Sequence, residues 1–580
     1  MPQPVRILVV FVDGPMLFFQ PPMKKKPNNA LSRRQFLGAA ASGAMALGLG
    51  PTALVLSGQG RGLAPAAGTP DLRLINGRVH TMDARSAIAR AVTIRNGRFV
   101  TVGDAAPAAT PGARTIDLGG RTVIPGIIDA HNHFVNLGNR PGYHTVIENA
   151  TSIAEIQKTL AARRPNVPES EFITAMGGWH TNQFQERRLP NRKELDDAVP
   201  DRPVLLLQGF NGPSSTNSLG KKLLEAEPNP IIVDENGAIA GGLPSTTALF
   251  KLRQRQTLQD KMRSTVDAWA YSAGMGLTSH LDQVGLASPG PLTPNQALAA
   301  FDPYRMYDAW LELYRQGKAT IRLQANFLHN QNDKALPELR ERLRNQFPFF
   351  GSDMMMTGGI GESAAPGDGT GEVWLEAQRL VAQARWRNEN HTLNLASFEN
   401  EIVGYEKVNA EFNITDLRWV ISHIPFATPP LLQRLKALGA GAQLTGWRYL
   451  QGTMQNNGSP FKMVMESGIR AGMHSDSVHI SPLNPWLHIY YAVTGVNALG
   501  QLINGGQQIS RQDALRLYTR ENGWFLRMED RLGSIEPGRL ADLAVLSDDY
   551  LTVTDEQLKR IRSVLTVVDG KIVHDAGVLK

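Results

Sequence analysis

The chain has 580 residues, of which 42% are hydrophobic and 19% charged, so it can form a large folded core and is not disordered throughout. It contains no cysteine, which excludes disulfide bonds, zinc fingers, iron–sulfur clusters and a thiol nucleophile. The net charge is +7, but residues 1–66 hold seven basic side chains and one acidic one, so the nearly neutral remainder predicts no nucleic-acid partner.

The first 66 residues have the pattern of an export leader. Arg33 and Arg34 precede an uncharged run rich in glycine and alanine, from Gly38 to Leu56, and Ala64-Pro65-Ala66 offers small residues for cleavage. This pattern resembles a twin-arginine signal, which predicts delivery of the folded protein to the periplasm or another extracytoplasmic space by the twin-arginine translocation machinery. The alternatives are a buried helix and a retained membrane anchor, which the short, glycine-interrupted run disfavours. We expect the natural start near Met23.

Short strands separated by turn dipeptides follow the leader and return at the other end of the chain. They are expected at Leu72–Ile75, Gly77–Thr81, Ala91–Arg95, Arg98–Val102, Ala544–Leu546, Val564–Val568 and Lys571–His574. The dipeptides Asn76-Gly77, Asn96-Gly97 and Asp569-Gly570 are typical of hairpin turns. This pattern predicts one small β-sandwich built from both chain ends.

Between these ends, short apolar runs alternate with helical stretches. The runs are Thr122–Ile128, Pro203–Leu207, Ile321–Phe327, Thr392–Ala396, Leu417–Ser422, Ala442–Thr445 and Ile469–Met473. Such alternation predicts an α/β protein with a parallel sheet, most economically a (β/α)8 TIM barrel. The expected domains are a leader (1–66), the first half of the β-sandwich (67–125), the barrel (126–528) and the second half of the β-sandwich (529–580).

One apolar strand ends in a His-x-His pair, His131 and His133. Since strand side chains alternate, both imidazoles lie on one face, and at the C-terminal end of a barrel strand they form half of a metal site. The alternative is a pair of ordinary surface histidines. Three more ligand-type residues, His391, His423 and Asp476, lie beside apolar runs further along the chain. Their joint occurrence favours a metal centre over isolated core or loop residues.

These motifs resemble the amidohydrolase superfamily of metal-dependent hydrolases, and most closely the branch that contains N-substituted formamide deformylases. The matching segments are Val123–His133, Gly178-Trp179, Arg202–Val204, Gly276–Ser279, Ser422-His423, His474–Asp476 and Leu532–Leu543. The resemblance covers the chain from about Asp71 to its end.

The resemblance implies roles for the site residues. His131, His133, His391 and Asp476 would hold one divalent ion, expected to be zinc, and His423 would be a further ligand or a hydrogen-bond donor in catalysis. Asp476 would also be the general base. A metal-activated water would then hydrolyse a carbon–nitrogen bond in an amide, formamide or carbamate, but not in a peptide.

Two stretches depart from the family pattern. The branch carries a lysine, often carboxylated, that bridges two metals near the fourth strand, but Met354–Met356 stand near that position. A thioether forms no carbamate, so we expect a single ion. Glu362 is either a substitute, as a bridge for a second metal or as a proton carrier, or an exposed loop residue. The Asp-Gly-His expected after the second strand reads Gln208-Gly209-Phe210-Asn211, which changes the pocket.

Several residues and functions stay open at this point. Trp179 and His180 are candidates for the substrate pocket, with core packing as the alternative for Trp179, and His280 is either a contact that supports the site or a core histidine. Deamination of a ring amine, and a degenerate barrel that binds a small molecule without converting it, are the alternative functions. The expected partners are a small-molecule substrate and the export machinery, with a homodimer as a family expectation.

Overall fold

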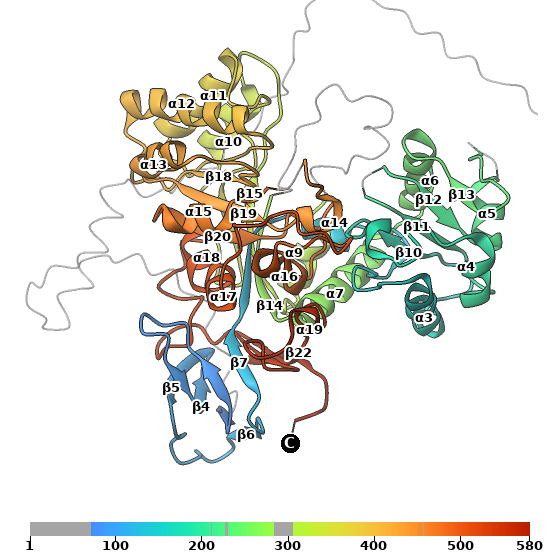
Figure 1. Cartoon of the computed structure of the whole chain (residues 1–580), viewed down its shortest axis with the longest axis horizontal. Coiled ribbons are helices and arrows are strands. Elements are labelled where there is room, and N and C mark those ends of the chain that lie inside the picture. Colours follow the sequence, from blue (N-terminus) through green and yellow to red (C-terminus); the bar gives the residue numbers. More distant parts are fainter. Residues whose placement is uncertain (1–70, 210, 227–229, 284–304, 456–457, 580) are drawn as a thin grey trace, which may run out of the picture. The chain divides into compact units, whose positions relative to one another are not determined.

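Eight strands form two parallel, four-stranded sheets, which we call the central sheets (Figure 1). The computed structural model describes residues 71–209, 211–226, 230–283, 305–455 and 458–579, and the leader with Arg33 and Arg34 lies outside them. The strand orders are β16-β15-β14-β8 and β17-β18-β19-β20. In chain order the eight strands are β8 (Ile127–Asn132), β14 (Leu277–Asp282), β15 (Arg322–Phe327), β16 (Met355–Ile360), β17 (Glu389–His391), β18 (Val420–Ser422), β19 (Gly441–Thr445) and β20 (Arg470–His474).

The two sheets meet along two seams. At the first, Ile360 of β16 pairs with Asn388 as an isolated parallel bridge. At the second, the backbone N–H of Asp476, just beyond β20, donates to the carbonyl oxygen of His131 in β8 at 3.1 Å. The strands are largely buried but carry many polar residues, such as His131 in β8 and Gln324 in β15, and β17 reads Glu-Asn-His, so they depart from the apolar runs that are usual in buried parallel sheets. Helices separate the strands, which gives a TIM-barrel-like α/β arrangement.

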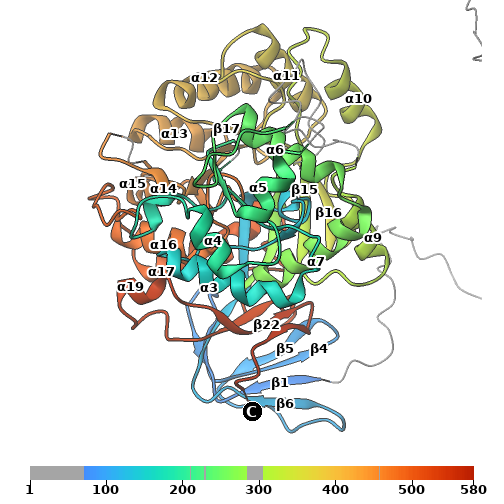
Figure 2. The ribbon, with the colours of Figure 1, turned by 90° about the vertical axis from the view of Figure 1, so that its right-hand side faces the viewer.

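The helices cover the sheets and build the main core with them (Figure 2). α7 (Leu258–Gly274) begins after Thr257, whose side-chain oxygen accepts from the backbone N–H of Asp260 and whose own backbone N–H donates to the Asp260 carboxylate. This helix buries Met262 and Trp269. No helix among the described residues is long and apolar enough to cross a membrane. The described helices after β14 are α9 (Asp308–Arg315), α10 (Pro337–Asn345), α11 (Glu372–Gln383), α12 (Leu395–Phe412), α13 (Pro429–Ala437), α14 (Arg448–Gln451), α15 (Phe461–Glu466), α16 (Pro485–Thr494), α17 (Arg511–Tyr518), α18 (Arg520–Phe525) and α19 (Asp555–Leu558).

A separate five-stranded sheet lies between β8 and β14 in the chain. Its order is β13 (Ala238–Ile239), β12 (Ser214–Thr216), β11 (Val204–Leu207), β10 (Ile173–Met176) and β9 (Tyr143–His144). Helices α3 (Ile153–Arg163), α4 (Arg192–Ala198), α5 (Ser218–Leu224) and α6 (Leu243–Gln254) accompany it. This part has two apolar clusters of its own, one around Ile173 and Leu206 and one around Leu205 and Leu249.

Two expected central strands are therefore wrong. The run at Pro203–Leu207 belongs to the five-stranded sheet, and the second central strand is β14 instead. Thr392–Ala396 is no strand, because β17 ends at His391 and Asn394 caps α12 by accepting from the backbone of Ser397. The asparagine side chain offers a helix start that apolar character alone does not reveal.

Strands from both chain ends pair in one sheet. The order of this six-stranded sheet is β23 (Lys571–Asp575), β22 (Ser563–Val568), β21 (Leu543–Leu546), β7 (Thr122–Pro125), β2 (Arg78–His80) and β3 (Ile88–Ala89). A second sheet contains β5 (Arg98–Gly103), β4 (Ala91–Arg95), β1 (Leu72–Ile75) and β6 (Arg114–Asp117). Leu74 and Phe99 of the second sheet share one apolar cluster with Val545 and Val567 of the first.

Candidate metal centre

Five strand ends of the central sheets bring imidazoles and carboxylates together. Because parallel strands end at the same edge, residues far apart in sequence converge there. Two groups of ligand-type side chains have ligand atoms within 4.8 Å of one another and share one carboxylate. They are His131, His133, Glu362 and Asp476 in the first group, and Glu362, His391 and His423 in the second.

Glu362 is the carboxylate that links the two groups. Its Oε2 lies 3.1 Å from Nε2 of His131, 3.4 Å from Nδ1 of His391 and 3.9 Å from Nε2 of His423. Its Oε1 lies 3.7 Å from Nε2 of His133. Only 15% of its side chain is exposed. The interpretation of Glu362 as an exposed loop residue is therefore wrong.

Asp476 lies close to three of the same histidines. Its Oδ1 lies 3.3 Å from Nε2 of His133 and 3.7 Å from Nε2 of His131, and its Oδ2 lies 3.9 Å from Nδ1 of His423. Asp476 and His423 have φ angles of 54° and 70°, in the left-handed region that side chains other than glycine rarely adopt. Backbone strain of this kind is typical of functional sites.

The local sequence explains why Glu362, and not a methionine, reaches the centre. Met355 begins β16, whereas Glu362 stands just beyond the C-terminal end of that strand, at the edge where the other ligand-type residues lie. Gly361 allows this close approach, because a Cβ there would lie 2.7 Å from Nδ2 of Asn326 and 3.0 Å from Cβ of Glu389. On β16, the fourth central strand, the residue that reaches the centre therefore lies just beyond the C-terminal end of the strand and not at its start.

The electrostatics of the centre favour a cation. Burial alone would raise the pKa of Glu362, but His133 and His391 beside it hold that pKa well below its usual range. Burial would likewise lower the pKa of His131, but its contacts with Glu362 and Glu389 raise that pKa to about 10. The same negative potential that holds protons on these imidazoles attracts a divalent metal ion.

Glu389 is a residue of the centre that the sequence analysis missed. Its carboxylate is fully buried and lies 2.6 Å from Nδ1 of His131. Nη2 of Arg387 and Oγ of Ser422 donate to it at 3.0 and 2.6 Å. The sequence did contain a signal for Glu389. It lies two residues before His391 on the same strand, and this spacing puts both side chains on one face.

Trp179, His180 and His280, which the sequence offered as residues near the site, do not belong to the metal-type groups found among the described residues. Trp179 is 2% exposed and packs in the core of the five-stranded sheet, with its ring 5.8 Å from that of Phe184. His180 is partly exposed and caps a short helical turn by accepting from the backbone of Asn182. His280 is a core histidine that stacks on Phe134 at 3.9 Å.

The donor set of the centre fits a divalent metal. Imidazole nitrogens and carboxylate oxygens are among the ligands that Zn²⁺ binds. Most of these side chains are buried, and they lie at the C-terminal ends of the central strands. The carboxylate shared by two groups offers positions for one or two ions. Asp476 beside these positions is a carboxylate able to accept a proton from water.

Comparison with known proteins agrees with this geometry. A family model described as the amidohydrolase family matches residues 114–574. An N-substituted formamide deformylase from Arthrobacter pascens is 24% identical over 551 residues, covering 87% of this chain and 98% of the relative. A putative amidohydrolase, YtcJ, from Bacillus subtilis (strain 168) is 23% identical over 507 residues, covering 80% and 91%.

Solved structures share the fold. A metal-dependent hydrolase from Pyrococcus furiosus superposes with a TM-score of 0.54 at 21% identity, covering 83% of this chain and all of that one. The atrazine chlorohydrolase from Arthrobacter aurescens TC1, complexed with zinc, gives a TM-score of 0.50 at 14% identity, covering 87% and 95%. At these identities the likeness concerns the fold.

Proposed function

Because the chain belongs to the amidohydrolase family and is a hydrolase of carbon–nitrogen bonds other than peptide bonds, we propose that it cleaves an amide, formamide or carbamate at the centre around Glu362 and Asp476. The observation that carries the proposal is the position of Glu362, whose carboxylate faces four histidines from three other strand ends. The similarity to an N-substituted formamide deformylase supports small formamides as the first substrates to test.

The residues around Glu362 would hold a divalent cation, which we infer to be zinc. Such an ion supplies Lewis acidity, lowering the pKa of a water toward about 7 and polarising a carbonyl. Asp476 takes the proton of the attacking water on a carboxylate oxygen and passes it to the leaving nitrogen. His423 would serve as a further ligand or donate a hydrogen bond to the substrate oxygen. His131, His133 and His391 serve as neutral ligands.

The number of ions is a separate question. The sequence predicts one, because a methionine stands near the expected lysine. The shared carboxylate of Glu362, with His131 and His133 in one group and His391 in the other, favours a second ion instead. We therefore infer a bridging role for Glu362.

We further infer that the two central sheets close as one (β/α)8 barrel and that the sheets of the chain ends form a β-sandwich. The backbone contacts at both seams support the first point, and the shared apolar cluster supports the second. On this view residues 67–125 and 529–580 are the halves of the sandwich, and residues 126–528 contain the barrel with the inserted five-stranded sheet.

Export by the twin-arginine route is part of the proposal. Its support is the sequence of residues 1–66, with Arg33 and Arg34 before an uncharged run. The partners would be the translocation machinery during export and a small-molecule substrate afterwards, with a homodimer as the proposed assembly. A folded protein carrying its metal suits this route, since twin-arginine export transports folded chains.

The test is metal analysis of the purified mature protein together with a substrate panel. The panel contains N-substituted formamides, simple amides, carbamates and aminated heterocycles, each with metal-stripped and zinc-reloaded enzyme. We expect hydrolysis of the first three classes that disappears on stripping and returns with zinc. Turnover of only the heterocycles would establish a deaminase, and binding without turnover would establish a non-catalytic barrel.

A further inference from the structure

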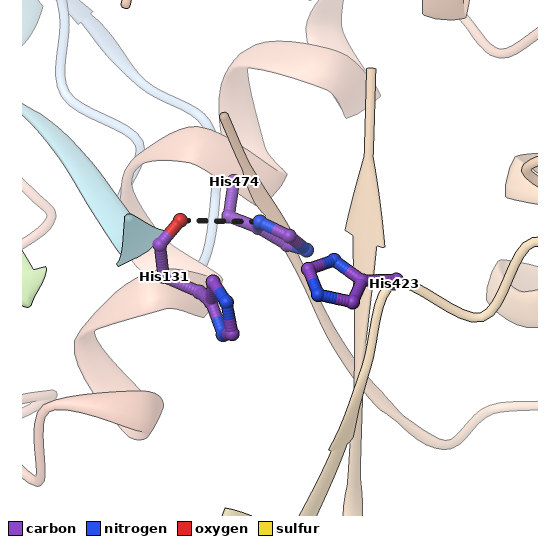
Figure 3. Close-up of side chains that lie close together, drawn as sticks. All are labelled: His131, His423 and His474. Carbon is purple, nitrogen blue, oxygen red and sulfur yellow. Dashed lines mark hydrogen bonds between the residues drawn. The ribbon is translucent and has the colours of Figure 1, made fainter. Parts of the chain in front are cut away.

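Three buried imidazoles face one another in this centre, and one of them has no role so far. His131 lies in β8, His423 directly follows β18 and His474 ends β20 (Figure 3). Their ring centroids are 4.8 Å apart for His131 and His423, 4.7 Å for His131 and His474, and 5.1 Å for His423 and His474. One ligand nitrogen of each lies within 4.8 Å of the other two.

A hydrogen bond fixes the ring of His474. Its Nδ1 lies 3.1 Å from the carbonyl oxygen of His131 (Figure 3). Because a carbonyl oxygen only accepts, Nδ1 carries the hydrogen, and Nε2 of the neutral ring is left with a lone pair. Figure 3 shows this second nitrogen directed toward the ring of His423.

Two nitrogens of facing rings have no hydrogen-bond partner among the described residues. They are Nε2 of His474 and Nδ1 of His423, and both are buried. Buried polar atoms are usually satisfied in folded proteins, and because these two nitrogens belong to facing rings that also adjoin His131, they leave a position for a group that the polypeptide does not supply. The ring spacing fits an ion, because nitrogens about 2.0–2.1 Å from one tetrahedral zinc put the ring centroids about 5 Å apart.

We propose that His474 is a metal ligand of this centre and that, with His131 and His423, it forms a pocket of three imidazoles for a late first-row divalent ion. Imidazole donors suit Zn²⁺, whereas Mg²⁺ and Mn²⁺ prefer carboxylate oxygens. His474 therefore biases the centre toward zinc. The inference rests on the proposed function in one respect only, that a divalent cation occupies this centre.

Anomalous diffraction at the zinc edge tests the proposal on the wild-type protein. We expect a zinc ion about 2.0–2.1 Å from Nε2 of His474. A zinc ion bound elsewhere in the centre, with Nε2 of His474 accepting an N–H from Nδ1 of His423, overturns the ligand role while leaving the proposed function intact. A protein that binds no divalent ion at all overturns both.

A matched pair of variants gives an independent readout. His488 is also fully buried, with Nε2 2.7 Å from the carbonyl oxygen of Pro482, but it belongs to none of the metal-type groups. We expect His474→Ala to lower zinc affinity, measured by chelator competition, by at least about 10-fold, and His488→Ala to leave it unchanged.

The cobalt-substituted proteins separate a ligand from a supporting residue. Loss of an imidazole ligand changes the d–d absorption of bound Co²⁺, so the spectrum of His474→Ala should differ from those of wild type and His488→Ala. An unchanged spectrum and zinc affinity in folded His474→Ala overturn the proposal. If circular dichroism shows that His474→Ala does not fold, His474→Gln and the diffraction experiment decide.

Discussion

Oε1 of Glu389 lies 2.6 Å from Nδ1 of His131, although the two residues belong to different central sheets, Glu389 to β17 and His131 to β8. Because a carboxylate only accepts, Nδ1 of His131 carries the hydrogen and its Nε2 faces Glu362. Arg387 and Ser422 hold Glu389 in turn. A carboxylate behind a metal-binding histidine fixes its ring and raises its basicity.

The first prediction concerns this contact. Replacing Glu389 with glutamine keeps the size of the side chain but removes its charge, so Glu389→Gln should lower zinc affinity by about 10–100-fold without unfolding the protein. Chelator competition measures the affinity. Glu401→Gln is the matched control, since Glu401 is also buried but lies in α12, outside the metal-type groups. Equal affinities for both variants would remove Glu389 from the centre.

The second prediction concerns the general base. Asp476→Asn should keep the fold, because the side chain projects from a strand end and not from the packed core, yet slow hydrolysis by about 10²–10⁴-fold. Single-turnover rates on the best substrate of the panel measure the loss. A variant with a near-normal rate would show that another group takes the proton.

The third prediction concerns metal stoichiometry. With Glu362 shared by two groups, we expect two ions per active chain by elemental analysis, and one in Glu362→Ala. One ion per fully active wild-type chain would support the single-ion interpretation of the sequence. Glu338→Ala, in α10 and outside the metal-type groups, is the control for nonspecific loss.

The fourth prediction concerns acid stability. Burial lowers the pKa of His280 to about 3, and its ring is held neutral between Asn132 and Ser272. Below its unfolded pKa of about 6.5, this histidine binds a proton in the unfolded chain but not in the folded one. The free energy of unfolding therefore decreases as the pH is lowered, by about 2 kcal/mol at pH 5 for this histidine. We expect His280→Asn to show a shallower decrease of melting temperature from pH 7 to 5. If the melting temperatures of wild type and His280→Asn decrease equally from pH 7 to 5, His280 is not a source of the acid sensitivity.

The fifth prediction concerns export. Replacing Arg33 and Arg34 with lysine should leave the precursor in the cytoplasm, because the twin-arginine pathway reads the guanidinium pair. Cell fractionation followed by an immunoblot measures the distribution. Replacing Lys24 and Lys25 with arginine is the control that keeps the charge of the leader unchanged. Normal periplasmic delivery of the double lysine variant would exclude this route.

The local pattern of the sequence determined much of the centre in advance. An apolar strand that ends in His131 and His133 predicts two imidazoles on one face, because side-chain alternation is a property of the strand itself. The pairing of both chain ends in one sheet followed from the repeated hairpin pattern, and the structure confirms it through β7 and β21. These conclusions need only short-range geometry.

Tertiary structure alone decided which residues meet at long range. Glu362 lies 231 residues from His131 in the chain, and Glu389 lies 258 residues away, yet both contact its ring. No local pattern carries such a contact, because it depends on strand order, on where each strand ends and on the close approach that Gly361 permits. The same reason explains why Val204–Leu207 looks like a central strand and pairs in another sheet, since apolar character fixes burial but not the partner strand.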